Sequence, residues 1–205
     1  MKIKPESTEG FVKPPRSGHF FSRFFLFLVE KKLGKPLVAQ RILLWYPKAF
    51  WGSGLMEALV AHDEREVPHR LLALIRLLVS FRVSCAFCID LNGKDYAKIG
   101  ISDGEIEGLK NADGWKNIAT FSGKERAALA YVEGACLTPV SYPVEVVANL
   151  KNHFDEKGLV LIASTAAQVN FWTRLIQGLG APPAGFSENC DILQKAAGNY
   201  MENTN

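Results

Sequence analysis

The 205-residue sequence lacks the features that several classes of protein require. Its 24 basic residues nearly balance its 21 acidic ones, and both signs are interspersed, so no concentrated basic face indicates a nucleic-acid partner. The longest apolar run, residues 24–29, is far shorter than the ~20 residues of a membrane-spanning helix. The first residues include acids and prolines and are not followed by a small-residue cleavage site, unlike a secretory signal. We therefore expect a cytoplasmic protein without nucleic-acid or membrane partners.

Alternating strand patterns and fixed-period repeats are also missing. The chain instead carries helix signals, such as the two capping boxes that begin at Ser102 and Ser122. With 48% hydrophobic residues, it is long enough to bury a core without disulfide support. We predict an all-α protein with the following helices: 17–33, 37–45, 47–61, 69–81, 85–99, 103–110, 123–135, 144–154 and 156–177.

Four segments are expected along the chain. Residues 1–16 contain three prolines and form an arm, and residues 17–64 form an N-terminal helical extension. Residues 65–180 form the core, within which the nearly all-apolar stretch 71–79 reads as a buried helix. Residues 181–205 form a loosely packed tail, with one helical turn near 192–197.

The spacing of the cysteines is the feature of the sequence that indicates a chemical function. Cys85 and Cys88 are three residues apart at the expected start of a helix, after a plausible N-cap at Ser84, whereas Cys136 and Cys190 stand alone. This spacing brings two thiols close enough for a disulfide, and a helix start favours the reactive thiolate. Two alternatives remain open. The pair can be inert and buried, or it can bind zinc, although no second pair of ligands is present.

The residues around this pair resemble the core of the carboxymuconolactone decarboxylase/AhpD-like superfamily. The resemblance rests on Pro68–Leu74, Ser84–Asn92, the capped helix after Ser102, the helix Phe121–Tyr131 and Asn170–Arg174. It covers roughly residues 65–190, and residues 17–64 look like the extra helices of longer members. Family members are all-helical subunits that assemble into trimers or hexamers.

The resemblance also implies roles for the two cysteines. Cys88 would attack a peroxide and become a sulfenic acid, and Cys85 would resolve it as a disulfide. An external dithiol, such as a lipoyl protein, would then reduce the pair. Asn92 is the third expected site residue, because it lies four residues after Cys88, and no cofactor or metal is implied.

Two positions depart from the family pattern. Ala73 stands where the family has a glutamate, and Asn92 stands where it has a histidine, so neither can relay a proton. We therefore expect a slow peroxidase or another dithiol reaction, such as the reduction of a partner's disulfide. A non-catalytic oligomer or ligand-binding protein is the main alternative, and a lactone decarboxylase is a weaker one. The apolar stretches 20–29 and 71–79 further predict a homo-oligomer.

Overall fold

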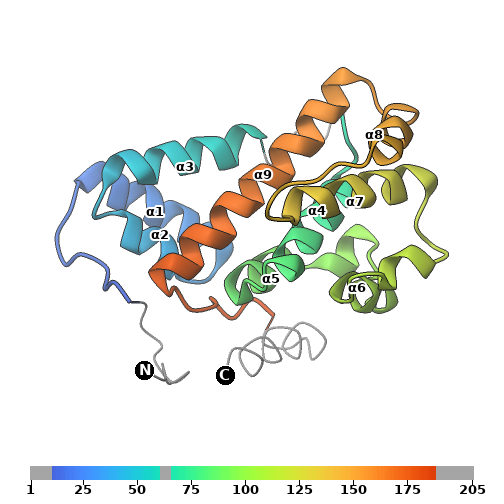
Figure 1. The fold of residues 1–205 in the computed structure, drawn as a ribbon. Coiled ribbons are helices and arrows are strands. Elements are labelled where there is room, and N and C mark those ends of the chain that lie inside the picture. Colours follow the sequence, from blue (N-terminus) through green and yellow to red (C-terminus); the bar gives the residue numbers. More distant parts are fainter. Residues whose placement is uncertain (1–10, 61–65, 188–205) are drawn as a thin grey trace, which may run out of the picture.

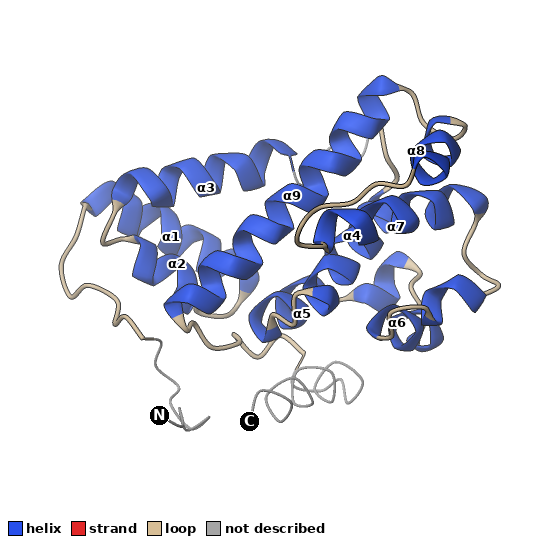
Figure 2. Cartoon of the chain, viewed as in Figure 1, coloured by secondary structure: helices blue, strands red, loops and turns tan. Residues whose placement is uncertain are grey.

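The computed structural model describes residues 11–60 and 66–187, and within these ranges it contains helices and no strands (Figure 2). The all-α prediction is confirmed. The helices are α1 (Phe20–Leu33), α2 (Val38–Leu43), α3 (Pro47–Val60), α4 (His69–Arg82), α5 (Ala86–Asn92), α6 (Asp103–Lys110), α7 (Gly123–Cys136), α8 (Val144–Lys151) and α9 (Glu156–Leu179). Short 3-10 helices at Tyr96–Ile99 and Gly114–Asn117 complete the set.

Helix α4 lies at the centre of the fold. It packs against α5, α6, α7 and α9, and its apolar side chains are almost fully buried. The sequence predicted this burial from an apolar composition on nearly all sides of the helix. The expectation that residues 71–79 also help to form a subunit interface is wrong, because helices of the same subunit cover them.

Helix α9 separates two groups of helices. The N-terminal helices α1, α2 and α3 lie on one side of it, and α4–α8 lie on the other (Figure 1). At 24 residues, α9 is long and apolar enough to cross a membrane by those two criteria alone. It packs against α3, α4, α5 and α7, and a core helix of a helical bundle meets the same criteria.

The capping residues explain where several helices begin. Ser102 and Ser122 each accept a hydrogen bond from the N3 backbone N–H, and their own backbone N–H groups donate to the carboxylates of Glu105 and Glu125, so both predicted capping boxes are present. The first helix was predicted to begin at residue 17, but α1 begins after His19 without a side-chain cap. The predicted turn near 192–197 lies outside the described residues.

The predicted helix 85–99 is interrupted. Helix α5 ends at Asn92, and Asp95 takes the left-handed conformation with φ 61° before the 3-10 helix at Tyr96–Ile99. The prediction of one helix over residues 85–99 rested on their apolar content, and apolar content does not reveal a left-handed turn within a segment. Local hydrogen bonding by aspartate makes that conformation more accessible to it than to most residues.

Candidate active site

The cysteine pair sits at the junction between α4 and α5. Ser84 was expected to be the N-cap of the helix that carries the cysteines, but Ser84 has a left-handed φ of 54° and Cys85 is the N-cap of α5. The Cys85 sulfur takes the place of a capping oxygen, because the Cys88 backbone N–H donates to it at 3.3 Å. The turn at Ser84 thus moves the helix start by one residue and places Cys85 at the cap and Cys88 inside the first turn.

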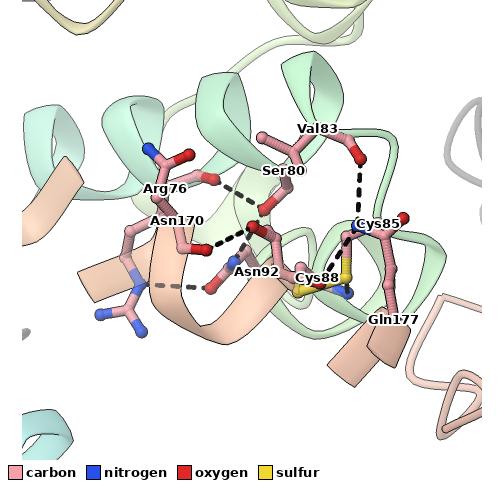
Figure 3. Close-up of a disulfide and its surroundings, with 9 residues drawn as sticks. Arg76, Ser80, Val83, Cys85, Cys88, Asn92, Asn170 and Gln177 are labelled. Atoms are coloured by element: carbon pink, nitrogen blue, oxygen red, sulfur yellow. Dashed lines mark hydrogen bonds between the residues drawn. A yellow bond between two sulfur atoms is a disulfide. The ribbon is translucent and has the colours of Figure 1, made fainter. Parts of the chain in front are cut away.

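The two cysteines are joined as a disulfide, with their Cα atoms 5.2 Å apart (Figure 3). Both are buried within the chain, at 0% exposure for Cys85 and 3% for Cys88. They belong to an apolar cluster that includes Leu37, Phe87 and Ile176. This environment keeps the pair away from bulk water.

A cavity of about 630 Å³ gives access to one of the two sulfur-bearing residues. Cys88 lines this cavity, whereas Cys85 is not among its lining residues. The walls are mostly apolar and come from both sides of α9, with side chains that include Leu26, Leu43, Phe50, Phe87, Leu91 and Trp172. A small molecule in this cavity would therefore meet Cys88 and be shielded from Cys85.

Asn92 lies beside the disulfide and is held by α4. Its Oδ1 accepts from Arg76 Nε at 3.1 Å, and its Nδ2 donates to Ser80 Oγ at 3.0 Å (Figure 3). Ser80 Oγ in turn donates to the Arg76 carbonyl at 2.7 Å. The structure thus brings all three predicted site residues together, while Ala73 contributes only an apolar part of the cavity wall.

Glu57 is a site residue that the sequence analysis missed. It lies on α3, and its carboxylate accepts from Arg76 Nη2 at 2.5 Å and from Trp172 Nε1 at 3.1 Å. Gln168 Nε2 also donates to it. No motif links Glu57 to the cysteines, because α3 reaches the cavity through its packing against α1, α2 and α9.

The segment after α9 covers the cysteine helix. Asp90, which is 3% exposed, accepts from the backbone N–H groups of Ala184, Gly185 and Ser187 at 3.0, 2.8 and 2.7 Å. Phe186 packs against the same cluster as the disulfide. The expectation of a loosely packed tail is thus wrong for residues 184–187, because a buried carboxylate anchors them.

Other polar candidates from the sequence do not line the cavity beside Cys88. Cys136 is a free thiol, and burial, followed by the nearby charge of Glu133, raises its pKa to about 11. Arg82 forms an ion pair with Glu133, as expected of an arginine at such a position. Cys190 lies outside the described residues.

Three further aromatic side chains lie at the cavity or next to it in sequence. His69 is exposed at the start of α4 and also lines the cavity. Trp172 is half-buried at the cavity, whereas its neighbour Phe171 is 44% exposed. Within the described ranges, no group of three or more metal-ligating side chains is present.

Two bacterial proteins resemble this chain in sequence. The uncharacterized protein YdfG of Bacillus subtilis is 32% identical over 108 residues, which is 52% of this chain and 71% of YdfG. The uncharacterized protein YnjA of Escherichia coli is 29% identical over 126 residues, covering 60% of this chain and 66% of YnjA. No family model matches the sequence.

Solved structures identify the fold. A protein of unknown function from Agrobacterium tumefaciens, whose name connects it with AhpD, is 26% identical with a TM-score of 0.59, covering 69% of this chain and 94% of its own. An alkylhydroperoxidase AhpD core protein from Ralstonia eutropha is 16% identical with a TM-score of 0.70, over 92% and 96% of the two chains. The apo debrominase Bmp8 is 17% identical with a TM-score of 0.76, over 93% and 100%.

The helical fold of this chain is that of the AhpD-like proteins. This chain belongs to the AhpD-like superfamily, a group that includes peroxidase-related proteins.

Proposed function

We propose that this protein is a cytoplasmic thiol-dependent oxidoreductase that reduces small organic hydroperoxides. One observation carries the proposal: Cys88 lines an apolar cavity of about 630 Å³, and Cys85 lies within bonding distance behind it. Hydrogen peroxide needs no apolar cavity of this size. An organic hydroperoxide can bury its apolar part there and present its O–O bond to the Cys88 sulfur.

The reaction runs in two steps. The Cys88 thiolate attacks the terminal oxygen of the hydroperoxide, the O–O bond breaks, and the alkoxide takes a proton and leaves as an alcohol. The Cys85 thiol then attacks the resulting sulfenic acid at sulfur, and water leaves as the disulfide forms. An external dithiol supplies the two electrons and two protons that restore both thiols.

The cavity also bears on the choice of reductant. Cys88 is reached through the cavity and Cys85 is buried, so the reductant has to attack the Cys88 sulfur first. A slender dithiol, such as a lipoyl group, fits this requirement better than a thiol on the flat face of a protein.

Single-turnover kinetics test the proposal. The reduced protein is mixed with one equivalent of cumene hydroperoxide or of hydrogen peroxide, and free thiols are counted over time. The proposal predicts the loss of two thiols per chain, faster with cumene hydroperoxide, and no such loss in Cys88→Ser. Thiols that persist in the presence of both peroxides would favour the ligand-binding alternative.

A second candidate function uses the same cavity for reductive dehalogenation. Bmp8 is a debrominase that has been solved with 2,3,4-tribromopyrrole, and the cavity here is large enough for a small aromatic ring. Two thiols and an aryl bromide would give the arene, hydrogen bromide and the disulfide. Bromide release from a brominated pyrrole, coupled to loss of the thiols, distinguishes this reaction from peroxide reduction.

We also propose that the protein forms a homo-oligomer through α1. Several of its aromatic side chains are more than half exposed within the subunit: Phe20, Phe21, Phe24 and Phe27. An exposed apolar patch on one helix is typical of an interaction surface, and a second copy of the chain is the partner that family resemblance favours. By the same resemblance, the assembly would be a trimer or a hexamer.

A further inference from the structure

Arg76 and Asn92 form a hydrogen-bonded pair of side chains beside Cys88, although the two relay residues of the family are absent. Arg76 lies on α4, lines the same cavity as Cys88, and is hydrogen-bonded through Nε to Asn92. Asn92 is four residues after Cys88, so the two side chains share one face of α5 (Figure 3). Asn92 therefore lies between Arg76 and Cys88, and it holds the guanidinium on the side of the cavity that Cys88 lines.

Glu57 fixes Arg76 from the opposite side. Its carboxylate accepts hydrogen bonds from Arg76, Gln168 and Trp172, which come from α4 and α9. These three partners all donate to the carboxylate and fix its position beside the guanidinium. Glu57 thus acts as a positioning residue for Arg76.

The position of Ala73 makes this arrangement compatible with the fold. Ala73 lies three residues before Arg76, on the same face of α4, and both line the cavity. A glutamate at position 73 would place a second carboxylate beside Arg76 and compete with Glu57 for it. The replacements at positions 73 and 92 are therefore consistent with each other, because one leaves room near Arg76 and the other binds it.

We propose that Arg76 is a permanent positive charge that stabilises the Cys88 thiolate in place of a titrating relay. This inference rests on the proposed thiol chemistry. A guanidinium stays protonated at all physiological pH values, and a cation near a thiol favours its thiolate form. Asn92 and Glu57 hold the cation in place, and peroxide cleavage then depends on one ionisation, that of Cys88.

The other charged groups at the cavity are placed differently. Lys32 and Asp95 are exposed, and His69 lies at the exposed start of α4. Lys94 Nζ lies 4.9 Å from the centre of the Phe186 ring and donates to the Leu33 carbonyl at 3.4 Å. Lys94 is thus held between the end of α1 and Phe186, whereas Arg76 is held beside Asn92.

The test measures the thiol pKa of Cys88 without any peroxide. A Cys85→Ser background leaves Cys88 as the single reactive thiol of the pair and keeps a good N-cap, since serine is favoured there. The alkylation rate of Cys88 is followed against pH and mapped by peptide mass. We expect Arg76→Met to raise the pKa by about one unit, which slows alkylation roughly tenfold below the pKa. Arg76→Lys should retain part of the effect.

Arg82→Met is the matched control. Arg82 lies on the same helix, its side chain is as buried as that of Arg76 at 13% exposure, and it also pairs with a glutamate, but it does not line the cavity. This variant should lose stability without a change in the Cys88 pKa. Equal pKa shifts in both arginine variants would indicate a general structural effect and overturn the proposal.

A double variant keeps the test decisive if Arg76→Met folds poorly. Glu57→Gln with Arg76→Met removes both charges and leaves no unpaired carboxylate, so folding should recover while the raised Cys88 pKa remains. An unchanged pKa in a folded variant that lacks Arg76 would contradict the proposal. The peroxide assay on the unmodified protein decides the proposed function separately, since the pKa measurement does not use peroxide.

Discussion

Ser187 donates two hydrogen bonds to Asp90 across 97 residues of sequence, from its backbone N–H at 2.7 Å and from its hydroxyl at 2.6 Å. Asp90 is on the cysteine helix, and Ser187 follows α9. The contact brings residues 184–187 over the buried side of the disulfide, while the cavity opens towards Cys88. The two sulfurs thus have different surroundings within one helical turn.

The Asp90 contact makes a prediction about access to Cys85. Asp90→Ala removes the acceptor of four hydrogen bonds, so residues 184–187 should detach from α5. We expect the free energy of unfolding to fall by about 2–3 kcal/mol, because several donors lose a buried charged partner. Dithiothreitol should also reduce the disulfide faster than in the unmodified protein.

Chemical denaturation and the kinetics of reduction measure these two effects. Asp103→Ala serves as the control, because Asp103 accepts an exposed hydrogen bond from Tyr96 away from the disulfide. Unchanged reduction kinetics in a destabilised Asp90→Ala protein would mean that residues 184–187 do not shield Cys85.

Cys136 provides a prediction on thiol selectivity. Burial and the charge of Glu133 raise the pKa of Cys136 to about 11, so its thiol stays protonated and unreactive at neutral pH. Iodoacetamide at neutral pH should therefore modify the reduced cysteine pair and leave Cys136 unmodified. Labelling of Cys136 should rise as the pH approaches 11. Peptide mass mapping over a pH series measures this, and rapid labelling of Cys136 at neutral pH would contradict the prediction.

The ion pairs of Arg70 predict a pH-dependent part of the stability. Arg70 Nη2 lies 2.6 Å from Glu105 and its Nε lies 2.8 Å from Glu125. Burial by itself raises the pKa of Glu105, but hydrogen bonds from Arg70, Thr120 and the Ser102 backbone outweigh it and lower the pKa below the usual 4.5. A lowered carboxyl pKa stabilises the fold above pH 4.5, and this stability is lost as the pH falls through the lower value.

Arg70→Met should lower the free energy of unfolding by about 3 kcal/mol at neutral pH, because it leaves a buried carboxylate without its partner. The difference from the unmodified protein should shrink below pH 4.5, where protonation of Glu105 removes that charge. Urea unfolding across this range measures it. Lys116→Met, which breaks an exposed pair with Asp113, should have little effect at either pH.

Helix α1 predicts the assembly of the protein. Phe20→Lys with Phe24→Lys places two charges on the exposed aromatic face, so the oligomer should dissociate in sedimentation experiments. Val144→Lys is the control, because Val144 is 82% exposed on α8 and belongs to a different surface. An unmodified protein that sediments as a monomer at micromolar concentration would contradict the assembly proposal.

Local signals in the sequence predicted much of the fold. The capping boxes at Ser102 and Ser122 fix helix starts through interactions between residues three apart, and the apolar composition of residues 71–79 reports burial. The left-handed turns at Ser84 and Asp95 were missed, because each depends on backbone conformation at a residue that also occurs in helices.

The candidate site was only half predictable. Cys85, Cys88 and Asn92 are neighbours in sequence, so their spacing already indicated that they lie together. Glu57, Arg76 and Asp90 acquire their contacts through packing between distant helices and the segment after α9. No periodicity within one helix carries such information, so the sequence offered Arg76 and Arg82 equally as cations near the thiols, with ordinary ion pairing as the commoner role of an arginine.

The most direct test of the account is the mass of the cysteine peptide after one turnover with cumene hydroperoxide. The unmodified protein should lose two hydrogen atoms at the Cys85–Cys88 peptide, and Cys85→Ser should gain one oxygen atom at Cys88 that dimedone traps. Oxidation that appears only at Cys136 or Cys190, with the pair still reduced, would contradict Cys88 as the reacting thiol.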